Sequence, residues 1–359
     1  MNDRSAATPR SRVAQAPRVG DLPSGPLDSL GDVQGVQVGH ATIADGSRQT
    51  GVTMIVPHPG NLFLEKVPAA ACVLNGFGKT VGLMQLIELG ALESPIALTN
   101  TFSVGAVATS LVRRAIAATP EIGRSMSTVN AVVGECNDGW LNDMSAFAVG
   151  DAHCDAAFAT AAAIFDRGSI GAGRGMSCFG IKGGIGTASR IVNIDGMPYT
   201  IGTLVLANFG RTTQFTLAGR RIGPVLAKRL AETEPPAERG SIIIVLATDA
   251  PVDSRQLRRT AFRSAAGLAR TGSNFGHGSG DVAIAFSIAD RIPERAVAAL
   301  RARHVLAEPR LERLFDAAAE STEQAILDAI FSATTVVGRD GHVRRSLLDV
   351  APDWADLDT

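Results

Sequence analysis

The sequence predicts an α+β fold in which a sheet core is covered by helices. Strand-like segments are numerous, and turn signals such as Asp45-Gly46 and Asp195-Gly196 separate pairs of them. Helical patterns are gathered into longer stretches between the strands, which is typical of a sheet with helices packed on it. The chain has 359 residues, of which 45% are hydrophobic, so it can bury a large core. Residues 26–359 show no internal repeat and no hinge linker, and we expect them to form one domain.

Apolar runs and alternation predict the strands, and apolar spacings of three or four residues predict the helices. The predicted strands cover residues 36–40, 51–57, 69–74, 96–99, 129–134, 189–194, 199–208, 241–247, 282–286 and 334–337. The predicted helices cover residues 82–92, 106–118, 156–166, 254–269 and most of 292–331. Asp253 or Ser254 is expected to cap the helix that starts near residue 254.

The composition excludes several classes of partner. The formal net charge is -1 and charged residues make up 19%, so no strong field attracts nucleic acid or an anionic membrane surface. No apolar run approaches the roughly 20 residues that span a bilayer. The four cysteines form no Cys-x-x-Cys pair, so we expect core thiols, no metal site and no cofactor. Residues 1–25 lack an apolar signal region, and we expect a disordered tail and a cytoplasmic protein.

Ser241 stands at an abrupt change in the character of the chain. The segment before it is polar and carries two prolines, whereas the residues after it are continuously apolar. If the bond between Gly240 and Ser241 were cut, Ser241 would carry a hydroxyl and an α-amine with a reference pKa of about 7.7–8.0. Such an amine suits the role of general base for the neighbouring hydroxyl. The alternative interpretation is that Ser241 simply opens an interior strand.

Other polar residues lie at the ends of predicted strands. Asn208 ends one strand, where its amide suits either an oxyanion hole or an ordinary turn. Ser279 and Asp281 place a hydroxyl and a carboxylate just before the predicted strand 282–286. Glu135 follows the strand 129–134 and heads a loop dense in acids and amides, which suits either a site for a cationic ligand group or a solvated turn.

Several of these stretches together resemble a known family. The segments that carry the resemblance are Gly35–Thr42, Leu98–Gly105, Glu135–Asp143, Lys182–Arg190, Ala207–Gly210, Gly240–Pro251 and Gly278–Asp281. The sequence is similar to the self-cleaving aminopeptidases that also act as D-alanine esterases and amidases, grouped with the β-peptidyl aminopeptidases in peptidase family S58. The resemblance implies a four-layer αββα sandwich with N-terminal-nucleophile chemistry.

The resemblance also implies roles for individual residues. The precursor is expected to cut itself between Gly240 and Ser241, which yields an α-chain, 1–240, and a β-chain, 241–359. Ser241 then corresponds to the nucleophile and Asn208 to an oxyanion-hole donor. Ser279 and Asp281 correspond to the residues that support the amine of the nucleophile.

The substrate side of the site is implied in the same way. Glu135 corresponds to an acid that meets the free amine of the substrate, with Asn137 and Trp140 beside it. Trp140 stands where we expect a tyrosine, and Phe102 stands where relatives often carry a polar residue. These two departures predict an altered substrate pocket with catalysis retained.

The implied activity is the release of N-terminal amino acids from small peptides, amides or esters, with L-α, D-α and β-amino residues all open. The implied assembly is a homo-oligomer, a tetramer of αβ units. Two alternative functions remain open. One is an acyltransferase similar to those that move acetyl between ornithine and glutamate, although these use threonine where this chain has Ser241. The other is a non-catalytic protein that retains the sheet.

Overall fold

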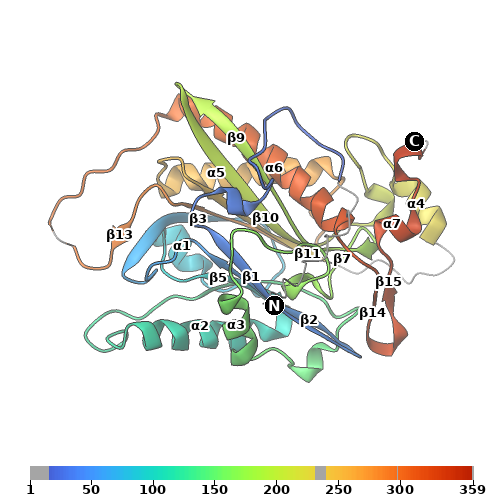
Figure 1. Ribbon diagram of the computed structural model, residues 1–359, viewed down its shortest axis with the longest axis horizontal. Helices are drawn as coiled ribbons and strands as arrows, with labels where there is room; N and C mark the ends of the chain where they lie inside the picture. The colour runs from blue at the N-terminus through green and yellow to red at the C-terminus, as the bar shows by residue number, and fades with distance from the viewer. Residues whose placement is uncertain (1–15, 231–239, 297, 358–359) are drawn as a thin grey trace, which may run out of the picture.

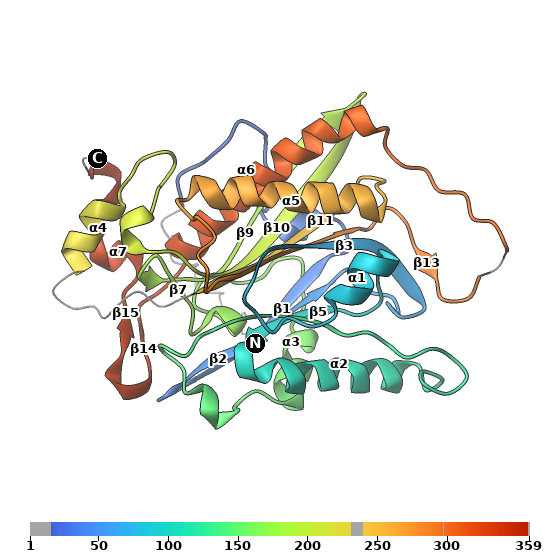
Figure 2. The same ribbon diagram turned by 180° about the vertical axis from the view of Figure 1, so that it is seen from behind.

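Two β-sheets lie face to face, and helices cover the outer face of each (Figures 1 and 2). The structure is a computed structural model that describes residues 16–230, 240–296 and 298–357. The helices α2 and α3 lie on one side of the pair of sheets in these views, and α5 and α6 lie on the other. The predicted four-layer αββα sandwich is confirmed.

The first sheet has the strand order β1-β2-β5-β6. Its strands are β1 (Gln37–Asp45), β2 (Arg48–Val56), β5 (Ile96–Asn100) and β6 (Val132–Cys136). The helices on its outer face are α2 (Val104–Ala118) and α3 (Asp151–Ala159). The predicted hairpin at Asp45-Gly46 joins β1 and β2, and β5 and β6 run parallel because α2 returns the chain between them.

The second sheet has the strand order β13-β3-β12-β11-β10-β9, with β4 paired to β3. Its strands are β3 (Glu65–Gly76), β4 (Ala91–Leu92), β9 (Gly184–Ile194), β10 (Met197–Asn208), β11 (Ser241–Thr248), β12 (Gly280–Ser287) and β13 (Ile292–Pro293). The helices α5 (Ser254–Arg270) and α6 (Glu312–Phe331) cover its outer face. The remaining short elements are α1 (Leu83–Leu89), β7 (Ser177–Cys178), β8 (Ile181–Lys182), α4 (Gly223–Leu230), β14 (Val336–Val337), β15 (Val343–Arg344) and α7 (Leu347–Val350).

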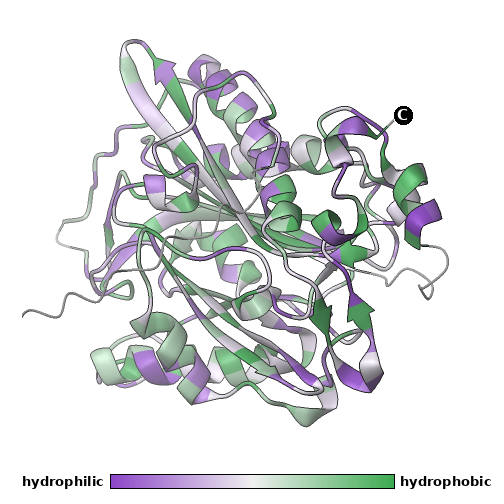
Figure 3. Ribbon diagram, turned by 45° about the vertical axis from the view of Figure 1, so that its right-hand side comes forward, coloured by the Kyte–Doolittle hydropathy of each residue, from purple (hydrophilic) through white to green (hydrophobic). Residues whose placement is uncertain are grey.

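The strand β11 is apolar throughout because both of its faces are buried. Ile242, Ile244 and Leu246 pack in the core shared with α5 and α6, whereas Ile243 and Val245 pack in the core between the two sheets. Each such side chain contributes roughly 1.5–3 kcal/mol by leaving water. Hydrophilic residues lie mainly on the outer helices, the loops and the strand tips (Figure 3). The prediction of a buried strand that starts at Ser241 is therefore confirmed.

The helix α5 begins where its sequence predicts. The Asp253 carboxylate accepts a hydrogen bond from the Gln256 amide at 2.7 Å, and the Gln256 side chain accepts one from the Asp253 amide at 3.2 Å. This capping box satisfies two of the amides that the first turn leaves without partners in the helix. In the described ranges, no helix combines the length and the apolar character needed to cross a membrane.

Several predicted boundaries are wrong; the helix predicted at 82–92, for example, ends at Leu89, and Ala91 and Leu92 form β4. The helix predicted at 156–166 ends at Ala159, because Ala162 pairs with Val38 and holds the chain against the edge of β1. The helix predicted over most of 292–331 starts only at Glu312, because Ile292 and Pro293 pair with β3 and the residues just before the helix, Glu308–Leu311, form a short 3₁₀ turn that contains Pro309. The strand predicted at 129–134 is β6, which starts three residues later and ends two residues later.

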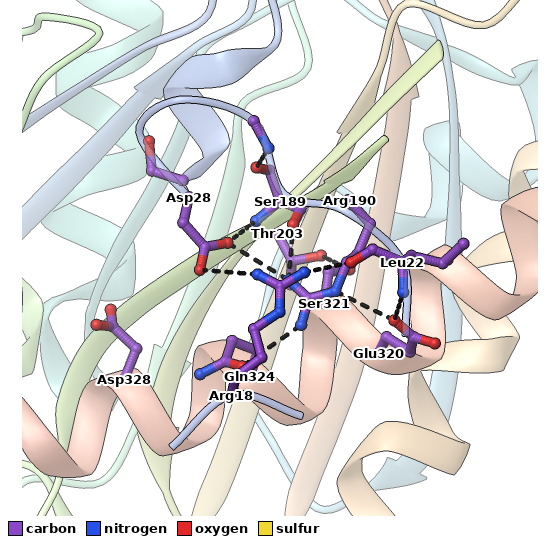
Figure 4. Close-up of polar contacts among 12 residues, drawn as sticks. Arg18, Leu22, Asp28, Ser189, Arg190, Thr203, Glu320, Ser321, Gln324 and Asp328 are labelled. Atoms are coloured by element: carbon purple, nitrogen blue, oxygen red, sulfur yellow. Dashed lines mark hydrogen bonds and ion pairs between the residues drawn. The ribbon is translucent and has the colours of Figure 1, made fainter. Parts of the chain in front are cut away.

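Residues 16–25 form part of the packed structure, which contradicts the disordered tail expected over residues 1–25; residues 1–15 of that tail lie outside the described residues. Arg190 on β9 is fully buried, and its guanidinium donates to the Val19 carbonyl at 2.7 Å. It also forms ion pairs with Glu320 on α6, at 3.2 Å, and with Asp28, at 3.4 Å (Figure 4). Composition alone did not predict this order, because the partners of the segment lie far away in the sequence.

The Arg190 network supports a prediction about stability. Arg190→Met removes one partner of a buried ionic cluster and leaves Glu320 and Asp28 without their shared cation, so the free energy of unfolding should fall by about 3 kcal/mol in urea titrations. Arg48→Met is the matched control, because Arg48 pairs with Asp45 on the surface and should change that free energy by less than about 1 kcal/mol. Equal effects of the two substitutions would contradict the anchoring role of Arg190.

Candidate active site

Ser241 is the first residue of β11, and two neighbouring strands fix its surroundings. It pairs in register with Asn208, the last residue of the antiparallel strand β10. Its Oγ accepts a hydrogen bond from the Gly280 amide at 3.0 Å, at the start of the parallel strand β12. Gly240 lies so close to β10 that a Cβ there would stand 1.7 Å from the Asn208 carbonyl oxygen. Only glycine therefore fits immediately before Ser241.

The Asn208 side chain is buried and held at both ends of its amide. Its Oδ1 accepts a hydrogen bond from the Ser177 amide at 2.8 Å, and its Nδ2 donates to the Asn137 carbonyl at 2.9 Å. These two contacts define which end of the amide is the donor. Nδ2 carries a second hydrogen, and Asn208 is the register partner of Ser241.

Ser279 and Asp281 meet beside Ser241, at the start of β12. The Ser279 Oγ donates to Asp281 Oδ1 at 2.5 Å. The other carboxylate oxygen, Oδ2, is buried without a hydrogen-bond partner among the described residues. Burial raises the pKa of Asp281 to about 6, against the opposing hydrogen bonds from Ser279 and the Ile242 backbone. The register of β12 against β3 shifts immediately after Asp281, which is typical of a strand that redirects a side chain.

Glu135 belongs to the first sheet, and its carboxylate lies near Gly280, whose amide donates to Ser241. It lies within β6, so the prediction of a loop position after the strand is wrong. Its carboxylate accepts hydrogen bonds from the Lys79 amide, at 2.8 Å, and from the Thr101 hydroxyl. A Cβ on Gly78 would lie 3.3 Å from Glu135 Oε1 and 3.7 Å from the Gly280 Cα, so Gly78 sits between the acid and the amide that holds Ser241.

The loop after β6 carries Asn137 and Trp140, and these two residues have different contacts. Asn137 contributes its carbonyl to Asn208, while its own side chain accepts from the Gly139 amide at 2.9 Å within the turn. The Trp140 indole stacks on His342 with ring centroids 3.8 Å apart, and its Nε1 donates to the Val343 carbonyl at 3.4 Å. Asn137 therefore contacts the candidate site through its backbone, and Trp140 contacts the C-terminal hairpin β14–β15.

Sequence reasoning did not single out Thr101, which donates to Glu135, or two buried cations that neighbour Ser177, namely Lys182 and Arg344. Thr101 and Lys182 lie inside the segments that carry the family resemblance, and that position was the available signal. Lys182 is fully buried and donates from Nζ to the carbonyls of Gly173, Met176 and Gly183, each at 2.8 Å. Burial holds the pKa of Lys182 well below its usual range. Arg344 gave no sequence signal, because it lies beyond the last matching segment.

Three comparisons with known proteins agree with this geometry. Residues 28–344 match peptidase family S58. The chain is 36% identical to the β-peptidyl aminopeptidase BapA of Sphingosinicella microcystinivorans, over 96% of this chain and 90% of that protein. Its structure is similar to that of a β-aminopeptidase from Burkholderia sp., with a TM-score of 0.86, 36% identity, and 95% and 98% of the two chains covered.

A second similar structure is the L-aminopeptidase D-Ala-esterase/amidase of Ochrobactrum anthropi, described as a prototype for the serine aminopeptidases and a new variant among the N-terminal-nucleophile hydrolase fold. The TM-score is 0.84 and the identity 32%, with 94% and 98% of the two chains covered. The predictions of a hydrolytic enzyme of aminopeptidase type and of this fold are confirmed. The chain belongs to peptidase family S58.

Proposed function

We propose that the chain is a self-cleaving serine aminopeptidase in which Ser241 first cuts its own peptide bond and then attacks substrates. The observation that carries this proposal is the arrangement of polar groups around Ser241, at the start of β11. There the hydroxyl of Ser241 is held by the Gly280 amide, beside the Asn208 amide and the Asp281 carboxyl. These groups supply a nucleophile, an oxyanion donor and an acid for the new amine, which is what N-terminal-nucleophile chemistry requires.

Self-cleavage follows from the position of the Gly240–Ser241 bond. The Ser241 Oγ attacks the Gly240 carbonyl carbon, the carbon–nitrogen bond breaks, and the hydroxyl proton goes to the departing nitrogen. Water then hydrolyses the ester, which leaves a carboxylate on Gly240 and a free α-amine on Ser241. The close fit of Gly240 against the Asn208 carbonyl holds this bond at the end of a rigid strand.

The freed amine would act as the general base for the Ser241 hydroxyl. Its reference pKa of about 7.7–8.0 suits proton transfer near neutral pH. Asp281 Oδ2 is an acceptor with no other partner among the described residues, and Ser279 fixes the carboxyl through Oδ1. We assign Asp281 and Ser279 the task of orienting the amine, and Asn208 the task of donating to the oxyanion.

Glu135 is suited to bind the amine of a substrate. It is buried, its two hydrogen-bond donors are neutral, and within the described residues it has no ion-pair partner. A buried carboxylate of this kind is stabilised by a cation that a ligand brings. The substrates that we propose are accordingly peptides, amides or esters with a free amine, the classes named for the relatives above.

Two further proposals concern assembly and location. The resemblance to the family underlies the proposal that the cleaved αβ units assemble as a homotetramer, and the sequence composition underlies the proposal that the protein acts in the cytoplasm. Light scattering of the purified, processed protein tests the first of these, and fractionation of the source cells tests the second.

The first prediction from this mechanism is that purified protein consists of two fragments, one about twice as long as the other, with Ser241 as the N-terminus of the shorter one. Ser241→Ala should remain a single chain, because the acyl group then has no acceptor. Ser241→Cys is the matched control, because its thiol can accept the acyl group. The measurement is intact mass, and a Ser241→Ala protein that is cut at this bond would contradict self-cleavage.

The second prediction concerns pH. Burial raises the pKa of Asp281, so in the precursor its carboxyl becomes charged only as pH rises through about 6. If the charged form supports the reaction, fragments should form more slowly as pH falls from 7 to 5.

Asp281→Asn should lower turnover of processed protein about a hundredfold with little loss of folded protein.

The measurements for Asp281 are the rate of fragment formation in freshly synthesised chains across that pH range, and kcat of the processed variant. Near-wild-type turnover in processed Asp281→Asn would remove this carboxylate from the mechanism.

The third prediction is that the substrate must present a free amine. An amino-acid p-nitroanilide should be hydrolysed, and its N-acetyl derivative should not. Glu135→Gln should cost about tenfold to a hundredfold in kcat/KM for the free-amine substrate, because a charge-assisted hydrogen bond contributes roughly 1.5–3 kcal/mol. Glu88→Gln, on the exposed face of α1, is the control and should leave kcat/KM unchanged.

The comparison of the two p-nitroanilides also separates the alternatives. An acyltransferase would favour the acetylated compound and need an amine acceptor, and a non-catalytic protein would hydrolyse neither. Equal turnover of both compounds by the wild-type enzyme would exclude the amine-binding role of Glu135.

A further inference from the structure

The two contacts that orient the Asn208 amide come from two separate loops. The Ser177 amide, which donates to Oδ1, belongs to the short ribbon of β7 and β8. The Asn137 carbonyl, which accepts from Nδ2, belongs to the loop that follows β6. Asn208 therefore keeps its orientation only if both loops keep their positions relative to β10.

The buried side chain of Arg344 contacts both of these loops. The Arg344 guanidinium donates from Nε to the Ser177 Oγ at 3.0 Å. The same guanidinium lies over the Trp140 ring at 4.6 Å, in the loop that carries Asn137. Arg344 is only 1% exposed, so water does not weaken either contact. It arrives from β15, which lies 167 positions after Ser177 in the sequence.

The chemistry of the side chain fits a double contact. A guanidinium is planar and can stack on an aromatic ring while its edge donates hydrogen bonds, whereas an ammonium acts as a compact point charge. In Arg344 one rigid, planar group therefore links the Ser177 hydroxyl to the Trp140 ring.

We propose that Arg344 is a positioning residue for the reaction, which fixes the Asn208 amide by holding Ser177 and the Trp140 loop together. This inference rests on the proposed function of Asn208 as the oxyanion donor. After cleavage at Ser241, Arg344 belongs to the chain 241–359, whereas Ser177, Trp140 and Asn208 belong to the chain 1–240. The C-terminal hairpin of one fragment thus completes the site of the other.

The proposal predicts a loss in kcat with little change in KM. Arg344→Met and Ser177→Ala should each lower kcat about tenfold to a hundredfold, because a misdirected oxyanion donor weakens stabilisation of the transition state. KM for an amino-acid p-nitroanilide should stay within about twofold, because the groups that bind the substrate are intact. Arg344→Lys keeps the charge but loses the planar contact, and should fall between wild type and Arg344→Met.

A double-mutant cycle tests whether Arg344 acts through Ser177. If it does, the combined variant should lose no more kcat than the larger single loss. Arg229→Met is the matched control, because Arg229 also donates to a backbone carbonyl, that of Val350 at 3.3 Å, and its described partners, Val350 and Asp353, lie outside both loops. This variant should keep kcat within about twofold of wild type.

Three results would overturn the proposal. They are full multiplication of the two losses in the combined variant, an equal loss in Arg229→Met, and an unchanged kcat in Ser177→Ala. Ser177→Ala keeps the backbone amide and removes a single hydroxyl, so it decides the question even if Arg344→Met does not accumulate as processed protein. Failure of the proposed function would look different, because the wild-type enzyme itself would then lack cleavage at Ser241 or activity on the free-amine substrate.

Discussion

The register of β11 between β10 and β12 is the constraint on which the candidate site depends. Antiparallel pairing sets Asn208 opposite Ser241, and parallel pairing sets Asp281 opposite Ile242. A slip of one residue would move every side chain of the strand to the opposite face and carry the hydroxyl away from its partners. Burial of β11 in two cores holds this register, so the hydrophobic packing of the strand and the geometry of its first residue have the same cause.

The second requirement is close contact between the two sheets near Ser241. A Cβ on Gly134 would lie 3.0 Å from the Ile243 side chain, so a glycine at this point lets β6 approach β11. The next residue of β6 is Glu135, and Gly78 leaves room for its carboxylate beside Gly280. The sandwich thus brings an acid from one sheet close to the proposed nucleophile on the other. Glycines at the contact allow the two sheets to approach closely there.

The sequence predicted the parts of the fold that local patterns encode. The apolar run after Ser241 identified β11, and Asp253 identified the start of α5, because burial and capping depend on neighbouring residues. The site residues at strand ends were predicted from the same patterns and from the family resemblance. Arg344 and the early end of α3 were not predicted, since both depend on partners far away in the sequence. The family resemblance supplied the pairing of the two sheets, which composition and spacing do not determine.

The central claim is that Ser241 is both the N-terminus of a cleaved chain and the group that carries the acyl intermediate. Peptide mass spectrometry after rapid quenching of the enzyme with an activated amino-acid ester tests both parts at once. We expect an acyl adduct on the Ser241 side chain, in a peptide whose first residue is Ser241. An adduct on another residue, or on a peptide that still contains Gly240 joined to Ser241, would contradict it.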